Sequence, residues 1–176
     1  ITIGNQAFDL GLTKKYKWAG DGAIAESVNL PALGNKIEGF IGINRYIPVM
    51  EGPLNTPSHK KFYDEALVRL KKMDPSGPLP DRYVQSNYEA INALKLGMEK
   101  SKFQGRQDTQ KLIEALEGLV MKEGDDFPQG GGVIRKEDHQ AFIRQFIFEI
   151  KGGKHKIIET VAGDKTIVPP ACKFTA

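Results

Sequence analysis

Three amphipathic helical patterns follow one another in the middle of the chain, and they restrict the possible folds more than any other feature. The first begins at Thr56, whose side chain can cap a helix, followed by Pro57, which loses no hydrogen bond at the first helical position. The second begins after Asp81, another capping residue, and Gly105 separates it from the third. Their expected buried faces are Phe62, Ala66, Leu67, Leu70 and Met73; Val84, Tyr88, Ile91, Leu94 and Met98; and Leu112, Ile113, Leu116, Leu119 and Val120. These helices divide the remaining chain into two groups of segments.

Segments typical of strands lie on both sides of the helices. Before them, residues 16–19 are expected to form a short strand that ends at a Gly-Asp-Gly turn, and residues 39–46 have the β-branched and aromatic content of a buried strand. After them, apolar residues recur at even spacing over residues 142–150, and a glycine turn leads into a second strand over residues 156–161. The chain is therefore α/β, but it has too few strands to complete a sheet covered by helices on both faces.

Three further segments complete the expected order. Residues 3–12 fit the end of an amphipathic helix, with Gly11 placed where a C-terminal cap is useful. Residues 23–33 are expected to be helical in part, with Pro31 ending or breaking that helix. Residues 130–132 are three successive glycines and are expected to form a flexible loop. The strands need partners that this chain does not supply.

Composition and charge pattern exclude several classes of protein. Of the 176 residues, 40% are hydrophobic and 27% are charged, which is a globular composition. The longest apolar cluster, residues 142–150, is interrupted by charged residues and is far shorter than the roughly 20 residues of a membrane-spanning helix. The formal charge is only +3, and Lys and Arg are scattered among Asp and Glu. No basic stripe with interleaved aromatic residues is present, so we expect no nucleic-acid partner.

Four segments, in this order, resemble one family. Residues 17–46 read KWAGDGAIAESVNLPALGNKIEGFIGINRY, and residues 55–70 read NTPSHKKFYDEALVRL. Residues 83–100 read YVQSNYEAINALKLGMEK, and residues 131–161 read GGVIRKEDHQAFIRQFIFEIKGGKHKIIETV, with VPPACKF close behind. Together they are similar to the C-terminal half of type I periplasmic solute-binding proteins, in the branched-chain amino-acid and amide group of ABC-importer receptors.

The resemblance implies two Rossmann-like α/β lobes that are joined by a hinge of crossover strands and close over a small solute. On this basis residues 1–47 are expected in the C-terminal lobe, residues 48–140 in the N-terminal lobe, and residues 141–176 in a return to the C-terminal lobe with a β-hairpin. The closed, liganded form of such a receptor docks on a membrane permease. The fold is therefore expected to be only partly present, with the missing N-terminal half of the same protein as a further partner.

Asp21 is the leading candidate for ligand binding. It lies in the turn at the carboxyl end of a strand, where open α/β sheets bind ligands. The resemblance implies that an acid here pairs with the α-ammonium group of a solute. The alternative is a turn residue that bonds its own backbone, as Asp commonly does.

The other candidates follow from the resemblance and from their positions. Tyr83 matches a position where an aromatic ring lines the cleft. Tyr46 ends a strand beside the expected hinge, and its ring is expected either to pack in the core or to contact the ligand. Tyr88 is expected to pack in the core instead. The complete set of candidate ligand-binding residues is Asp21, Gly22, Tyr46, Tyr83, Gln85 and Ser86.

No pattern indicates catalysis, a metal or a cofactor. His139 has no second His or Cys at the spacing of metal ligands, and a zinc site needs three or four ligands that converge. The glycines at residues 130–132 lack the Lys-Ser/Thr of a phosphate loop. No serine has the context of a nucleophile elbow.

We therefore expect a binding receptor of an ABC importer, located in the periplasm or held outside the cell as a membrane-anchored lipoprotein. The expected ligand is a branched-chain amino acid or a related amino acid or amide. The alternatives are a ligand-sensing domain of the same fold in a signalling system, and an enzyme whose site is incomplete in this chain.

Two features concern the ends of the chain. The sequence starts with neither Met nor a leader, so the chain is expected to begin partway through a longer protein and not to fold or bind as an independent unit. Cys172, the single cysteine, cannot form a disulfide within the chain, which leaves a free thiol or an outside partner open.

Overall fold

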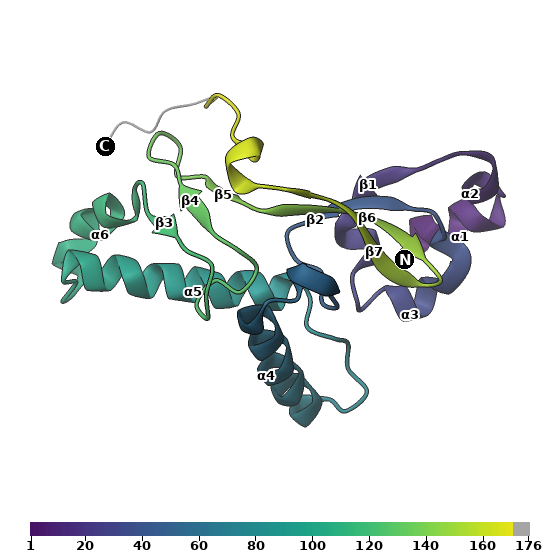
Figure 1. The fold of residues 1–176 in the computed structure, drawn as a ribbon, viewed down its shortest axis with the longest axis horizontal. Helices are drawn as coiled ribbons and strands as arrows, with labels where there is room; N and C mark the ends of the chain where they lie inside the picture. The colour runs from purple at the N-terminus through teal and green to yellow at the C-terminus, as the bar shows by residue number, and fades with distance from the viewer. Residues whose placement is uncertain (171–176) are drawn as a thin grey trace.

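The computed structural model describes residues 1–170 and contains two β-sheets toward opposite ends of an elongated molecule (Figure 1). Each sheet packs with its own helices around its own hydrophobic core. The first is called the four-stranded unit below, and the second the helical unit. Cys172 lies outside the described residues.

The four-stranded unit is built from both ends of the chain. Its strand order is β1-β2-β6-β7, in which β1 and β2 are parallel and the other neighbours are antiparallel. The strands are β1 (Ala19–Asp21), β2 (Ile41–Asn44), β6 (Gln145–Lys151) and β7 (Lys154–Val161). Its helical segments are α1 (Thr2–Asp9), α2 (Leu12–Lys15), α3 (Leu30–Leu33) and the 3₁₀ turns η1 (Gly22–Ala25) and η2 (Gly34–Ile37).

Alternation along β6 creates the core of this unit. Phe146, Phe148 and Ile150 are fully buried, and they pack with Leu33 and Phe40. Gly42 on β2 lies opposite Phe148, and a Cβ atom there would come within 2.3 Å of the ring. The absence of a side chain at Gly42 therefore lets the large ring cover the strand.

The helical unit contains the long helices and a three-stranded antiparallel sheet of order β3-β4-β5. The strands are β3 (Val120–Met121), β4 (Gly132–Ile134) and β5 (Ala141–Ile143). The helices are α4 (Pro57–Met73), α5 (Arg82–Ser101) and α6 (Thr109–Leu116), with 3₁₀ turns η4 (Arg106–Asp108) and η5 (Gly163–Thr166). The turn η3 (Gly52–Leu54) precedes α4, and its Leu54 packs against the core of the four-stranded unit. Its core is formed by Ala93, Leu119, Met121, Phe127 and Ile143.

The predicted helix starts are confirmed by the cap geometry. The hydroxyl of Thr56 accepts a hydrogen bond from the backbone N–H of His59 at 3.2 Å. The carboxylate of Asp81 accepts hydrogen bonds from the N–H groups of Tyr83 at 2.9 Å and Val84 at 3.1 Å. Each cap satisfies N–H groups that the first helical turn would otherwise leave without partners.

Three sequence predictions about strands and helix ends are wrong. The first strand is β1 rather than residues 16–19, because its pairing with β2 matches Ala19 with Ile41 and leaves the Trp18 ring to pack against Phe40. Pro31 does not end a helix; it lies in the first turn of α3, where its fixed φ angle is suitable. The third helix ends at Leu116, because Gly118 adopts a φ of +70° and redirects the chain into β3.

Two predictions in the C-terminal region are also wrong. Residues 142–150 do not form one strand: β5 pairs in the three-stranded sheet and β6 pairs in the other, with Arg144 between them. The expected flexible loop at residues 130–132 is buried or partly buried, and Gly132 belongs to β4. A Cβ atom at Gly132 would lie 2.6 Å from the carbonyl oxygen of Phe142, so the glycine permits the close approach of β5.

The apolar stripe predicted for the second helix is not its buried face. The buried positions of α5 are Gln85, Glu89, Ala93 and Gly97, spaced four residues apart. Gly97 lies against α6, where a Cβ atom would be 2.6 Å from Leu116. Small residues let two helices approach closely, and this contact decides which face turns inward. The predicted stripe is consequently open to solvent in part, with Ile91 66% exposed.

Candidate functional site

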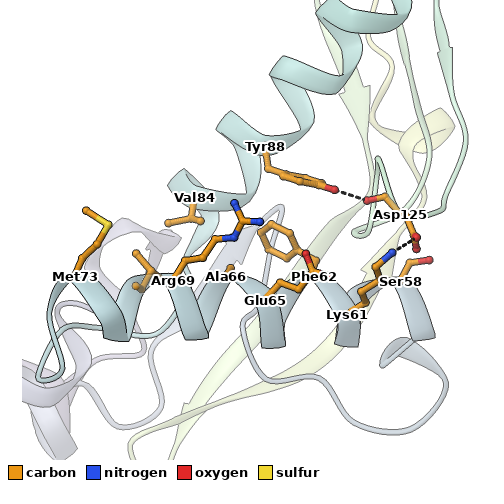
Figure 2. A pocket seen from close by; sticks show the side chains of 11 residues that line it. Ser58, Lys61, Phe62, Glu65, Ala66, Arg69, Met73, Val84, Tyr88 and Asp125 are labelled. Atoms are coloured by element: carbon orange, nitrogen blue, oxygen red, sulfur yellow. Dashed lines mark hydrogen bonds and ion pairs between the residues drawn. The ribbon is translucent and has the colours of Figure 1, made fainter.

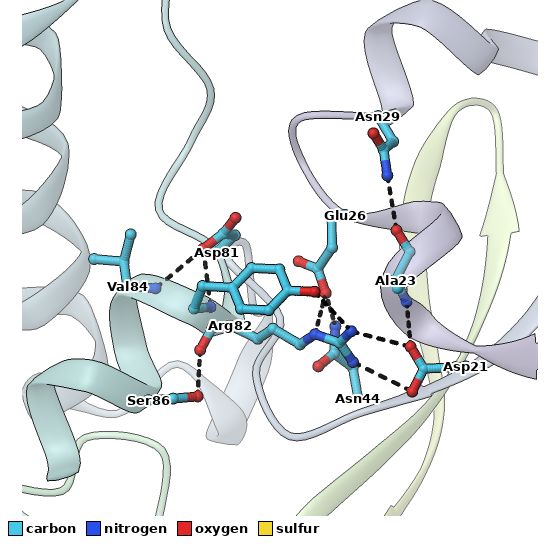
Figure 3. Close-up of polar contacts among 10 residues, drawn as sticks. Asp21, Ala23, Glu26, Asn29, Asn44, Asp81, Arg82, Val84 and Ser86 are labelled. Carbon is cyan, nitrogen blue, oxygen red and sulfur yellow. Dashed lines mark hydrogen bonds and ion pairs between the residues drawn. The ribbon is translucent and has the colours of Figure 1, made fainter. Parts of the chain in front are cut away.

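The candidate site lies where the four-stranded unit meets the beginning of α5 (Figure 3). One side is formed by the end of β1 and by η1, and the other by the first turn of α5. An ion-pair cluster joins them, and it contains Asp21, Glu26, Asn44 and Arg82. The additional bond from the Ser27 hydroxyl to the carbonyl oxygen of Leu79, at 2.8 Å, ties the same two segments together.

Asp21 ends β1 and caps η1. Its Oδ1 accepts a hydrogen bond from the N–H of Ala23 at 2.7 Å and another from Arg82 Nη2 at 3.0 Å. Its Oδ2 lies 3.4 Å from Arg82 Nη1, so the guanidinium engages both carboxylate oxygens. The hydrogen bond from Arg82 lowers the pKa of Asp21, although its side chain remains 68% exposed. Asp21 is thus an ionised carboxylate that already has a cationic partner.

Arg82 is held from its other side by a buried acid. Its Nε donates to Glu26 Oε1 at 2.9 Å, and the side-chain amide of Asn44 donates to the same oxygen at 2.8 Å. Glu26 is only 2% exposed, and burial raises its pKa, while the Asn44 hydrogen bond and the Arg82 charge oppose that rise. The Arg82 side chain is 17% exposed, so the guanidinium is the more firmly held member of its pair with Asp21.

Tyr83 and Ser86 follow Arg82 on α5. The ring of Tyr83 lies under the Arg82 guanidinium at 5.1 Å, and its hydroxyl accepts a hydrogen bond from Arg82 Nη2 at 3.2 Å. Tyr83 is 55% exposed and stands beside the Asp21 pair. Ser86 instead donates its hydroxyl hydrogen bond to the backbone carbonyl of Arg82, within its own helix. The structure therefore brings Asp21 and Tyr83 together through Arg82.

The remaining sequence candidates lie away from solvent. Tyr46 and Gln85 are fully buried, and among the described residues the Tyr46 hydroxyl has no hydrogen-bond partner. The Tyr46 ring packs against His59 and Phe62. Gly22 is buried beside β2, and a Cβ atom would lie 2.7 Å from the carbonyl oxygen of Ile43. The structure therefore does not bring Tyr46, Gln85 or Gly22 to the exposed surface beside Asp21 and Tyr83.

Sequence reasoning missed Arg82, Glu26 and Asn44. Arg82 follows a predicted helix cap and is adjacent to Tyr83, but no local pattern relates it to Asp21, 61 positions earlier. Glu26 carried a weak signal, because it directly follows the apolar residues 23–25, and an acid drawn into a core by such a segment needs a partner to stay ionised.

A second buried acid lies deeper in the helical unit. Glu89 on α5 is 7% exposed, and its Oε1 accepts a hydrogen bond from the N–H of Gln129 at 3.4 Å. Burial raises the pKa of Glu89 to about 7 from its ordinary value of 4.5. The folded protein therefore binds this proton more tightly than the unfolded chain does, and stability falls as pH rises from about 4.5 to about 7.

A Glu89→Gln variant is expected to gain about 1–3 kcal/mol in unfolding free energy at pH 8 and almost nothing at pH 4.5. The amide keeps the shape of the carboxyl group and removes the cost of burying its charge. Urea unfolding at both pH values measures the difference. Glu99→Gln on the same helix, with a side chain 61% exposed, is the matched control and should change neither value. An equal gain for Glu89→Gln at both pH values would contradict the assignment.

A groove of about 200 Å³ lies between α4 and α5 (Figure 2). Its walls are mainly apolar, and the rings of Phe62 and Tyr88 pack with centroids 5.0 Å apart. One end is polar, because the Asp125 carboxylate pairs with Lys61 and its backbone carbonyl accepts a hydrogen bond from the Tyr88 hydroxyl at 2.9 Å. None of the six sequence candidates lines this groove, so it is distinct from the site at Asp21.

Residues 1–170 contain neither a cluster of metal ligands nor a helix suited to a membrane. No group of three or more His, Cys, Asp or Glu side chains is placed to hold a metal ion in this part of the chain. No helix in the described range has the length and apolar character needed to cross a membrane.

Solved structures of solute-binding proteins match almost the whole chain. A solute-binding protein of an ABC transporter from Rhodopseudomonas palustris BisB5, in complex with 3,4-dihydroxybenzoic acid, has a TM-score of 0.70 and 20% identity, covering 92% of this chain and 42% of its own. The leucine-, isoleucine-, valine-, threonine- and alanine-binding protein from Brucella ovis has a TM-score of 0.67 and 20% identity, and the match covers 94% of this chain and 41% of the Brucella protein. An ABC transporter substrate-binding protein from Sphaerobacter thermophilus has a TM-score of 0.73 and 16% identity, and the match covers 92% of this chain and 41% of the Sphaerobacter protein.

The chain has the fold of type I periplasmic solute-binding proteins of ABC transporters, as the sequence resemblance implied. It spans about two fifths of the length of these structures, so the fold is partial. No protein-family model and no curated protein matches the sequence. The matching structures are solute-binding proteins, and the solutes named for them are of two kinds, aromatic acids and amino acids.

Proposed function

We propose that this chain is part of an extracytoplasmic receptor that captures a small polar solute for an ABC importer. The observation that carries the proposal is the meeting of two separately packed units at one polar site, where Asp21 from β1 faces Arg82 and Tyr83 from α5. A receptor of this kind works by the greater stability of its closed, liganded form, with no bond made or broken. Its partner in the membrane would be the permease of the importer.

Position within the fold supports this assignment. Asp21 lies at the carboxyl end of β1, and open α/β sheets bind ligands at this edge. Tyr83 adds an exposed aromatic face with a polar tip next to the carboxylate. Such a combination of a flat apolar surface and fixed polar groups orients a small solute.

The exposed apolar face of α5 supports the assignment of the chain to a two-lobed receptor. Ile91 is 66% exposed and Leu94 is 40% exposed, and their spacing of three residues puts both on one side of the helix. Apolar side chains gathered on one side of a helix usually pack against another part of the same protein or a partner. We propose that the remainder of the receptor covers this face.

Ligand capture predicts a rise in melting temperature when the protein, at its natural full length, meets its solute. A panel of amino acids, amides and small organic acids provides the candidates, because these include both kinds of solute named for the matching structures. A solute at one hundred times its Kd should add about 2.7 kcal/mol to the unfolding free energy. If no compound in the panel shifts the melting temperature, the receptor assignment fails.

A Tyr83→Ala variant should weaken binding of that solute by about tenfold or more, which corresponds to about 1.4 kcal/mol. The reason is loss of the aromatic surface beside Asp21, while stability should change by less than about 0.5 kcal/mol because Tyr83 is 55% exposed. Isothermal titration calorimetry measures the affinity. Tyr16→Ala is the matched control, since Tyr16 is 57% exposed and lies beyond α2, outside the cluster at Asp21. Equal affinity in the Tyr83 and Tyr16 variants would remove Tyr83 from the site.

A further inference from the structure

The two kinds of ligand found with this fold differ at one group. An amino acid carries an ammonium group beside its carboxylate, and an aromatic acid carries none. Asp21 is the acid that the family resemblance assigns to the ammonium. The contacts of Asp21 in this chain therefore bear directly on which kind of solute the site accepts.

A guanidinium already occupies the ammonium-binding side of Asp21. Arg82 reaches both carboxylate oxygens, at 3.0 and 3.4 Å, and the N–H of Ala23 takes a further acceptor position at 2.7 Å. Two-point pairing of Arg with a carboxylate is directional and strong compared with a single contact. An arriving ammonium group would have to compete with this pair for the same oxygens.

Arg82 is not free to move aside. Its Nε bonds to the buried Glu26, which is fixed in turn by Asn44, and its Nη2 also donates to the Tyr83 hydroxyl. Movement of the guanidinium would leave Glu26, 2% exposed, with its charge uncompensated. If Arg82 stayed, an ammonium at Asp21 would lie next to a like charge. Both routes oppose a solute that carries an ammonium group.

We propose that Arg82 serves as a built-in cation that fills the ammonium position at Asp21, so that the receptor selects small organic acids without an ammonium group over amino acids. The inference rests on the proposed function and names the substrate class of the same site. The exposed surface beside this pair is the Tyr83 ring with its hydroxyl, since Tyr83 is 55% exposed and the Arg82 side chain only 17%. The ring suits the apolar or aromatic body of such an acid, while the cluster offers no free anion to an ammonium group.

Matched pairs of solutes test the proposal in the protein at its natural full length. Leucine and 4-methyl-2-oxopentanoate differ only in the replacement of the ammonium-bearing centre by a keto group, and phenylalanine and phenylpyruvate form a second pair. Benzoate and 4-hydroxybenzoate represent the aromatic acids. Calorimetry should give each acid at least tenfold tighter binding than its amino-acid counterpart. Equal or tighter binding of the amino acids overturns the proposal and leaves the receptor assignment intact, whereas binding of no compound overturns both.

A paired substitution isolates the role of Arg82. The double variant Glu26→Gln, Arg82→Gln removes the cation without leaving a buried charge, and Glu26→Gln alone controls for the change at Glu26. In the double variant the preference should shift toward leucine by at least tenfold relative to the control, because Asp21 is then free to pair with an ammonium group. An unchanged ratio of leucine to 4-methyl-2-oxopentanoate affinity, in a variant that melts cooperatively, would assign the selectivity to other residues and reject the proposal.

Discussion

Replacing Phe148 by Ala is expected to lower the unfolding free energy by about 3–5 kcal/mol, the usual range for removing a buried aromatic ring. Phe148 is fully buried on β6, in the interior of the four-stranded sheet. Its ring covers Gly42, packs edge-on against His155 with centroids 4.7 Å apart, and lies 6.5 Å from the Phe40 ring. Since Gly42 has no side chain to move into the space, the cavity left by the ring stays open.

Urea unfolding of the full-length protein measures the loss. Ile158→Ala is the matched control, because Ile158 lies on the neighbouring strand β7 but is 56% exposed. Its loss should stay below about 1 kcal/mol, since little apolar surface is buried there. Phe148→Leu, which retains most of the volume, should lie between the two. A loss for Phe148→Ala no larger than that for Ile158→Ala would show that this unit contributes little to global stability.

Replacing Arg82 by Met is expected to cost about 3–5 kcal/mol, because the substitution leaves Glu26 buried without its ionic partner. Substitution of Asp21, the exposed acid of the same cluster, should have a much smaller effect on the unfolding free energy. An Asp21→Asn variant should lose less than about 1 kcal/mol, as is usual for an exposed ion pair, since the Asp21 side chain is 68% exposed. The contrast follows from burial alone, because Asp21 and Glu26 contact the same guanidinium.

A second substitution separates loss of the ion pair from loss of packing. Glu26→Gln added to Arg82→Met removes the stranded charge and should recover at least half of the lost stability. Chemical denaturation at pH 8, where a free carboxyl would be ionised, gives the largest difference between the single and double variants. If the double variant is as unstable as Arg82→Met alone, packing of the arginine stem is responsible and the charge of Glu26 is not.

Local chemistry was enough to place several elements. Thr56 and Asp81 begin α4 and α5 because each cap bonds N–H groups within three residues of itself. Gly152 and Gly153 form the turn of the C-terminal hairpin, with φ angles of +58° and +69°. Such positive angles cost a glycine little and are strained for most other residues. Helix caps and tight turns involve residues only a few positions apart, so they can be predicted from the adjacent sequence.

Predictions failed where a distant contact decided the outcome. The apolar stripe of α5 was expected to be its buried face, but contact of Gly97 with α6 turns another face inward. The apolar alternation over residues 142–150 does indicate strand, yet it contains no sign that the chain changes sheets at Arg144. A periodic pattern gives the local conformation and leaves the choice of partner open.

Some features of the candidate site could likewise be predicted from the sequence, and others depend on tertiary contacts. The sequence by itself determined that Asp21 lies at the carboxyl end of a strand and that Tyr83 lies near the start of a helix, because turns and helix caps depend on adjacent residues. Only the tertiary structure placed Arg82 between them, since that contact joins residues 61 positions apart and requires the four-stranded unit and α5 to meet. It also decided that Tyr46 and Gln85 are buried, because burial depends on how separate elements pack. The position of the candidate site is thus local information, and the net charge of the cluster at that position is not.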